Sequence, residues 1–153
     1  MLLPVEDVRK LAESILLANG VPESHARIQA GLFLEAEMRA IPSHGLLRLR
    51  RVIERIHAGL SVPDTTGDQQ WTARSFLSVD GQRGLGPVVA MAALDTIVPR
   101  AKEDGIAIAA IRNTNHLGAL AYYAEHVANE GVRGIHLLRD IRVGNFLRWR
   151  WFR

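Results

Sequence analysis

The chain has 153 residues, 48% of them hydrophobic and 23% charged, a composition typical of one soluble globular domain with a sizeable core. It contains no cysteine, which excludes disulfides, thiolate catalysis and metal sites built on cysteine. The formal net charge of +3 is unevenly spread: residues 133–153 carry +5, with six arginines against Asp140 alone, and residues 1–132 carry −2, so the high pI describes the end of the chain.

The first sixty residues predict a helical unit. Apolar side chains recur at three- and four-residue spacing along 4–20, 21–40 and 45–59, which is the spacing of amphipathic helices. Gly20 and Gly59 stand where a glycine ends a helix. The third helix should direct five apolar side chains inward: Leu46, Leu49, Val52, Ile53 and Ile56.

The character of the sequence changes after residues 61–68, a cluster of Pro, Gly and Asp that predicts a loop or linker. Strands then alternate with helices, which favours an α/β arrangement. Pro99 should kink or end the helix that contains it. The expected elements are a strand at 75–80, a turn at 80–87, a helix at 88–98, a buried strand at 105–113 and a helix at 118–131.

No segment predicts membrane insertion or export. Residues 1–20 lack a basic stretch followed by a long apolar one, and no run approaches the roughly 18 apolar residues of a spanning helix. We therefore expect a cytoplasmic protein.

The stretch PSHGLLR (42–48) is a first candidate site. Ser43 stands where it can cap the third helix, and Arg48 follows His44 at a spacing that places both on one helix face. An imidazole that donates a proton and a guanidinium that holds a carboxylate suit reduction of a 2-oxo or 2-imino acid. Alternatively, Ser43 only caps, His44 fills a first-turn position and Arg48 is a solvated charge.

The stretch NTNHLGAL (113–120) is a second candidate site. Its asparagines offer amide donors and acceptors, His116 offers a titratable ring, and Gly118 permits close approach of a ligand to the backbone. A flat cofactor ring or a phosphate can lie there. The alternative is an asparagine-rich turn that caps the next helix.

One further motif is interpreted as structural, and two well-known catalytic or metal-binding motifs are absent from the sequence. DGQRGLG (80–86) joins a strand to a helix but reads G-x-x-G-x-G, not the dinucleotide fingerprint, and has no P-loop lysine. We interpret it as a structural turn. There is no G-x-S-x-G elbow and no H-E-x-x-H motif, so neither a serine hydrolase nor a metal site is expected.

Four stretches together carry a family resemblance: SHGLLR (43–48), IERIHAGL (53–60), VDGQRGLGPVVAMAALD (79–95) and GIAIAAIRNTNHLGALAYYAEHVANEG (105–131). They resemble the type 2 malate/L-lactate dehydrogenase family. This non-Rossmann family of NAD(P)-dependent oxidoreductases also contains ureidoglycolate dehydrogenase, sulfolactate dehydrogenase, 2,3-diketogulonate reductase and piperideine-2-carboxylate reductase. The resemblance covers residues 1 to about 135.

The resemblance implies a role for each matched residue. His44 would be the general acid that protonates the carbonyl or imine, Ser43 its hydrogen-bonded partner, and Arg48 the anchor of the substrate carboxylate. His116 would lie near the reacting carbon. The nicotinamide cofactor would contact His116, Leu117, Gly118, Ala119 and Leu120.

The resemblance also implies an α+β fold, with a helical unit over 1–60 and a partial α/β domain of the non-Rossmann malate/L-lactate dehydrogenase fold over 61–135. The expected cofactor is NAD or NADP. The expected partners are a small 2-oxo or 2-hydroxy acid, or a cyclic imino acid, and a second copy in a homodimer; neither nucleic acid nor a membrane is expected. Arg50 and Val52 replace a proline and an aromatic residue that the family often has there.

Residues 136–153 form an atypical tail rich in arginine and tryptophan. Because relatives continue well beyond this length, we hypothesise a truncated member whose last residues come from a shifted reading frame. One alternative is an inactive fragment that pairs with a longer relative. Another is a cationic aromatic tail that binds nucleic acid or a membrane surface.

Overall fold

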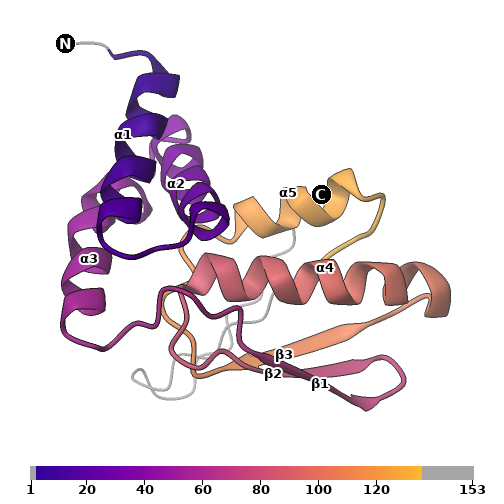
Figure 1. Cartoon of the computed structure of the whole chain (residues 1–153). Helices are drawn as coiled ribbons and strands as arrows, with labels where there is room; N and C mark the ends of the chain where they lie inside the picture. Colours follow the sequence, from indigo (N-terminus) through magenta and orange to yellow (C-terminus); the bar gives the residue numbers. More distant parts are fainter. Residues whose placement is uncertain (1–2, 136–153) are drawn as a thin grey trace, which may run out of the picture.

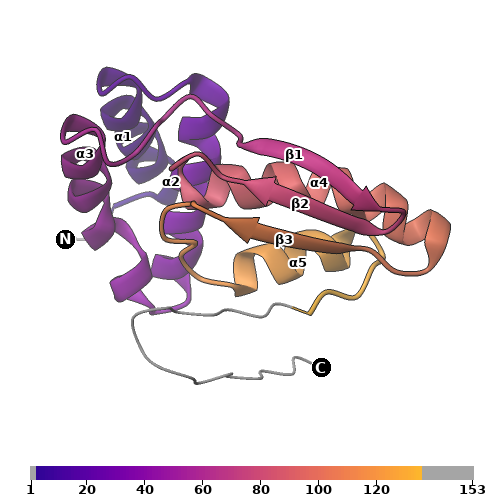
Figure 2. The ribbon, with the colours of Figure 1, turned by 90° about the horizontal axis from the view of Figure 1, so that it is seen from below.

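A computed structural model describes residues 3–135, and the atypical tail at 136–153 lies outside them. The helices α1–α3 gather at one end of the three-stranded sheet, α4 packs on one face of that sheet, and α5 lies beside α4 (Figure 1). Seen from below, the sheet lies in front of α4 and α5 (Figure 2). The elements are α1 (Val5–Ala18), α2 (Glu23–Met38), α3 (Leu49–His57), β1 (Asp68–Ala73), β2 (Phe76–Asp80), α4 (Gly86–Asp104), β3 (Ile108–Arg112) and α5 (Ala121–Asn129).

The first two predicted helices are confirmed. In α1 the side chains of Ala12 and Leu16 are buried against α2, as the apolar spacing requires. The chain reverses after α1 at Gly20, whose φ of +80° lies in the left-handed region that glycine enters at little cost. Pro22 precedes α2 with a fixed φ that suits a helix start.

The third helix begins later than predicted. Residues 45–48 do not join it, because Gly45 adopts φ −93° and ψ −146° and separates two short 3-10 turns, Pro42–His44 and Leu46–Arg48. The helix α3 starts at Leu49. Ser43 therefore lies inside the first 3-10 turn, and the prediction that it caps the third helix is wrong.

The sheet has the strand order β1-β2-β3. The strands β1 and β2 pair antiparallel, with Gln69 opposite Val79, whereas β2 and β3 pair parallel, with Val79 opposite Ile111. The strand β1 was not predicted. Its residues DQQWTA are mostly polar and almost all exposed, so the apolar alternation that marks a half-buried strand is missing.

The expected burial of the third strand is wrong. The strand β3 alternates between exposed and half-buried residues, and Ile108 is 50% exposed. Its inward side chains, Ala109 and Ile111, pack against the cluster formed by β2 and α4. A run of apolar residues predicts burial on both faces, but in the described residues helices cover one face only.

Pro99 does not end the helix that contains it. The helix continues through Pro99 to Asp104 and closes at Gly105, whose φ is +81°. A proline inside a helix removes one backbone hydrogen bond. Val98 is buried and Ile97 packs against the sheet, and we attribute the continuation to this apolar burial.

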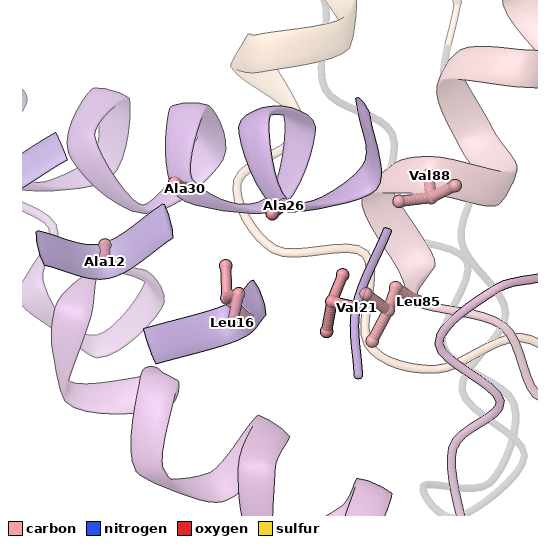
Figure 3. Close-up of a cluster of buried hydrophobic side chains, with 7 residues drawn as sticks. All are labelled: Ala12, Leu16, Val21, Ala26, Ala30, Leu85 and Val88. Carbon is pink, nitrogen blue, oxygen red and sulfur yellow. The ribbon is translucent and has the colours of Figure 1, made fainter. Parts of the chain in front are cut away.

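The core joins the helical end of the molecule to the sheet. One buried cluster contains residues of α1, α2 and the start of α4: Ala12, Leu16, Val21, Ala26, Ala30, Leu85 and Val88 (Figure 3). A second cluster places Leu32 and Phe33 of α2 with Ala90 of α4 and Tyr123 of α5. Together these clusters pack α1 and α2 against α4 and α5, and so join the helical end of the chain to the elements next to NTNHLGAL.

Candidate active site

The two candidate stretches meet at a pair of histidines. His44 ends the first 3-10 turn, and His116 lies in the loop between β3 and α5. Their ring centroids are 5.4 Å apart and the ring planes are inclined by 47°. The structure thus brings together the two titratable groups that the sequence singled out.

Ser43 and Arg48 lie beside His44. The hydroxyl Oγ of Ser43 is 3.0 Å from Nδ1 of His44, within hydrogen-bonding distance. Nε of Arg48 donates to the carbonyl oxygen of Ser43 at 2.7 Å. This tether uses one edge of the guanidinium and leaves both terminal NH₂ groups without a hydrogen bond to residues 3–135. Arg48 is therefore held next to His44 by the 3-10 turn, and not by the helical spacing that the sequence suggested.

Glu37, near the end of α2, supports this turn. Its Oε1 accepts a hydrogen bond of 2.8 Å from the backbone N–H of Leu46. The carboxylate lies so close to Gly45 that a Cβ at that position would be 2.7 Å from Cδ of Glu37. A side chain at Gly45 would therefore have to displace the Glu37 carboxylate that accepts the Leu46 hydrogen bond. The sequence did not predict a role for Glu37, because a single acidic residue on a helix with many charged residues looks like any surface residue.

His116 is held as a neutral ring. Its Nδ1 accepts a hydrogen bond of 2.8 Å from the backbone N–H of Gly118, so the proton of the neutral ring resides on Nε2. Partial removal of the ring from water, followed by the positive charge of Arg48 and the proximity of His44, lowers the pKa of His116 from 6.5 to about 4. At neutral pH His116 offers an N–H donor without a charge.

The residues after His116 form a close turn against α2. Gly118 has φ +75°, and a Cβ there would overlap the side chain of Leu32. The side chains of Leu117 and Leu120 pack toward the second core cluster, and the hydroxyl of Tyr123 donates to the carbonyl of Leu117. Ala119 is half-buried. Helix α5 starts only at Ala121, three residues later than predicted.

The asparagines before His116 fix the loop. Oδ1 of Asn115 accepts a hydrogen bond of 2.9 Å from Nε of Arg55 in α3, and its Nδ2 donates to the carbonyl of Gly84 at 3.0 Å. Asn113 has φ +52° and donates to the Asp80 carboxylate at 3.0 Å. Both amides therefore hold the backbone that carries His116.

The glycine-rich turn at 80–86 packs against this loop, in agreement with its interpretation as a structural turn. The backbone N–H of Gly81 donates to the carbonyl of Arg112 at 2.8 Å, and that of Asn115 donates to Gly84 at 3.1 Å. A Cβ on Gly86 would overlap the carbonyl of His116. The first residue of α4 thus touches the backbone of a candidate site residue, which only glycine permits.

Two further searches cover residues 3–135 alone. Within them no three side chains of His, Asp or Glu come together in a way that could hold a metal ion. None of the described helices has the length and apolar character needed to cross a membrane.

Comparison with known proteins agrees with this geometry. The family model for malate/L-lactate dehydrogenase matches residues 3–143. The L-sulfolactate dehydrogenase of Methanocaldococcus jannaschii is 33% identical over 135 residues, covering 88% of this chain and 39% of that protein. The malate dehydrogenase of Pyrococcus abyssi is also 33% identical, covering 88% of this chain and 37% of that protein.

Solved structures show the same fold. A dehydrogenase from Sinorhizobium meliloti superposes with a TM-score of 0.83 at 53% identity, over 86% of this chain and 41% of that one. The malate dehydrogenase of Pyrococcus horikoshii gives a TM-score of 0.82 at 33% identity, over 86% of this chain and 38% of that one. The chain therefore spans about two fifths of these relatives. It belongs to the malate/L-lactate dehydrogenase family, a family of oxidoreductases, as its sequence motifs predict.

Proposed function

We propose that the chain carries part of the active site of an NAD- or NADP-dependent oxidoreductase that transfers a hydride between a nicotinamide and a small 2-hydroxy or 2-oxo acid, or a cyclic imino acid. The observation that carries the proposal is the 5.4 Å approach of the His44 and His116 rings with Arg48 tethered beside them. Two relatives are named as L-sulfolactate dehydrogenase and Delta(1)-pyrroline-2-carboxylate reductase, and both names denote a carboxylic acid substrate.

His44 is the proposed proton donor in the reductive direction. As hydride adds to the substrate carbon, the electron pair of the C=O or C=N bond moves to the heteroatom, which takes a proton from His44. Ser43 contacts Nδ1 of His44 and so leaves Nε2 to face the substrate. In the oxidative direction the same nitrogen takes the proton back.

Arg48 is the proposed anchor of the substrate carboxylate. Its Nε is occupied by the carbonyl of Ser43, so the two terminal NH₂ groups remain to hold both carboxylate oxygens. Because Arg48 and His44 are joined through Ser43, the anchor and the proton donor keep a constant separation. Such fixed placement lowers the entropic part of the barrier.

The nicotinamide cofactor would supply or accept the hydride, and His116 with Leu117, Gly118, Ala119 and Leu120 would line its ring. The charge state of this stretch fits that role, because the low pKa of His116, about 4, leaves no positive charge beside the cationic oxidised nicotinamide. His116 would offer its Nε2–H as a donor. Leu117 and Leu120 support the backbone from the core side. We further propose that the protein works in the cytoplasm as a homodimer.

The test is a fluorescence titration of the purified chain with NADH and NADPH, combined with turnover assays on a panel of 2-oxo acids and cyclic imines. We expect saturable cofactor binding and turnover that falls at least 100-fold in His44→Ala. The matched control is His57→Ala, an exposed histidine of α3 that bonds Asn19. Absence of cofactor binding in folded protein would contradict the proposal for this chain and favour an inactive fragment.

A further inference from the structure

A cleft lies next to the candidate active site. It is a cleft of about 600 Å³ between the end of α3, the glycine-rich turn and the loop after β3, which is within the size range of small-molecule sites. Neither His44, Arg48 nor His116 lines it. Most of the residues that line it are polar, among them Arg55, Asp80, Gln82, Arg83 and Asn113.

Two guanidinium groups of this cleft are fixed without a carboxylate partner. Arg83 Nη1 donates to the carbonyl of Gly59 at 3.0 Å, and Arg55 Nη2 lies 3.5 Å from the carbonyl of Leu60. Since these carbonyls belong to consecutive residues, both guanidiniums lie at one wall of the cleft. Within residues 3–135 no carboxylate oxygen approaches either of them within 4.0 Å.

The one acid of the lining does not neutralise them. Asp80 pairs with Arg112 at 3.3 Å, and its oxygens also accept hydrogen bonds from Asn113 Nδ2 and the backbone N–H of Gln82, each at 3.0 Å. Asp80 is therefore paired with Arg112, which lies outside the lining, and carries a single negative charge against the two positive charges of Arg55 and Arg83. Several of their N–H groups still lack an acceptor among the described residues.

The backbone around the cleft is held in an unusual conformation. Gln82, Arg83 and Asn113 have φ values of +49°, +62° and +52°, a region that residues with a Cβ seldom adopt. Strained residues of this kind collect at ligand sites, where the surrounding structure enforces them. Here the hydrogen bonds between the two loops enforce them.

From the cleft, its unpaired arginines and its polar lining, we propose that this site binds a small oxyanion, the carboxylate or phosphate group of a ligand, between Arg55 and Arg83. The planar fork of a guanidinium matches two oxygens of either group. The fixed carbonyl anchors mean that little side-chain freedom is lost on binding.

Calorimetric titration of the 153-residue chain with inorganic phosphate and with malonate, at constant ionic strength set with NaCl, tests this proposal. We expect saturable binding of at least one anion, weakened tenfold or more in Arg83→Gln and less in Arg83→Lys, which keeps the charge but not the fork. The control is Arg50→Gln, because Arg50 is exposed on α3 and pairs with Glu54 at 2.8 Å. Arg55 is left unchanged because it holds Asn115.

The outcomes separate the ligand classes and the two proposals. Tighter phosphate binding assigns a phosphorylated ligand, and tighter malonate binding assigns a carboxylic acid. His44→Ala should retain anion binding even though it loses turnover, so loss of the oxidoreductase proposal would leave this one standing. No saturable binding in the wild type, or equal weakening in Arg83→Gln and Arg50→Gln, overturns it. Unfolding curves of each variant exclude misfolding as the cause.

Discussion

The rings of His44 and His116 lie 5.4 Å apart, although they belong to opposite halves of the chain and have different hydrogen-bond partners. His44 contacts a hydroxyl, which can donate or accept. His116 accepts a backbone N–H, which can only donate. The hydroxyl partner leaves either tautomer open to His44, whereas the low pKa of His116, about 4, keeps that ring neutral at physiological pH.

Replacing Arg48 by lysine should raise KM for a 2-oxo acid about 10- to 100-fold and lower kcat much less. Lysine keeps the positive charge but loses the planar fork and the tether to the Ser43 carbonyl. Steady-state kinetics on a 2-oxo acid would measure this. A substrate analogue in which an amide replaces the carboxylate serves as control, because its KM should change little. An unchanged KM for the acid would show that Arg48 does not hold the carboxylate.

Replacing Glu37 by alanine should loosen the turn that carries His44. The backbone N–H of Leu46 loses its acceptor, at a cost of about 1 kcal/mol. We expect faster hydrogen exchange of the Leu46 amide and reduced turnover. Glu37→Gln retains an oxygen acceptor and should restore both. Slow exchange in both variants would rule out this positioning role, whatever happens to the activity.

Acid should destabilise the fold through His116. Its pKa is about 4 in the folded chain and about 6.5 in the unfolded chain. Between these values the unfolded chain binds more protons, so the free energy of unfolding falls as the pH drops. After discounting for solvent screening of this exposed side chain, we expect the free energy of unfolding to fall by about 1 kcal/mol between pH 7 and pH 5. His116→Gln should lack this part of the loss in urea unfolding at both pH values, and an equal loss would contradict the prediction.

Replacing Gly86 by alanine should destabilise the chain by roughly 1–3 kcal/mol. The new Cβ would lie 2.7 Å from the carbonyl oxygen of Asn115 and closer still to that of His116. Gly59→Ala is the matched control. Gly59 has φ +65° but open space around it, so alanine there should cost about 1 kcal/mol from the backbone alone. Thermal unfolding compares the two variants, and equal losses would show that α4 can move away from the His116 loop.

Much of the fold followed from local signals. The helices α1 and α2 and the strand β2 are where apolar spacing and punctuating glycines predict them. The strand β1 was missed because it joins the sheet through backbone pairing and buries almost no side chain. The prediction that the helix ends at Pro99 was wrong because the sequence predicts the loss of one backbone hydrogen bond there but not the burial of Val98 beside it.

The candidate site was foreseen only in part. The SHG and NTNHLGAL stretches could be recognised in the sequence because their polar groups interrupt apolar patterns. The structure brings His44 and His116 of these stretches together. The hydrogen bonds that position these stretches join residues far apart in the sequence, so no local sequence pattern predicts them. Glu37 bonds Leu46 across a turn, and Arg55 of α3 bonds Asn115 in the second half of the chain. Only the folded chain shows that these residues position the site.

The hydrogen bonds that join the glycine-rich turn to the His116 loop have a consequence for motion. Gly81 donates to Arg112, Arg83 donates to Asn113, and Asn115 donates to Gly84, so both segments contribute donors and acceptors to one row of hydrogen bonds, which we call the seam. Opening any one of these bonds strains its neighbours, and the seam should therefore open as a whole. The lifetime of the His116 arrangement is then that of the entire seam, which is longer than that of any single bond within it.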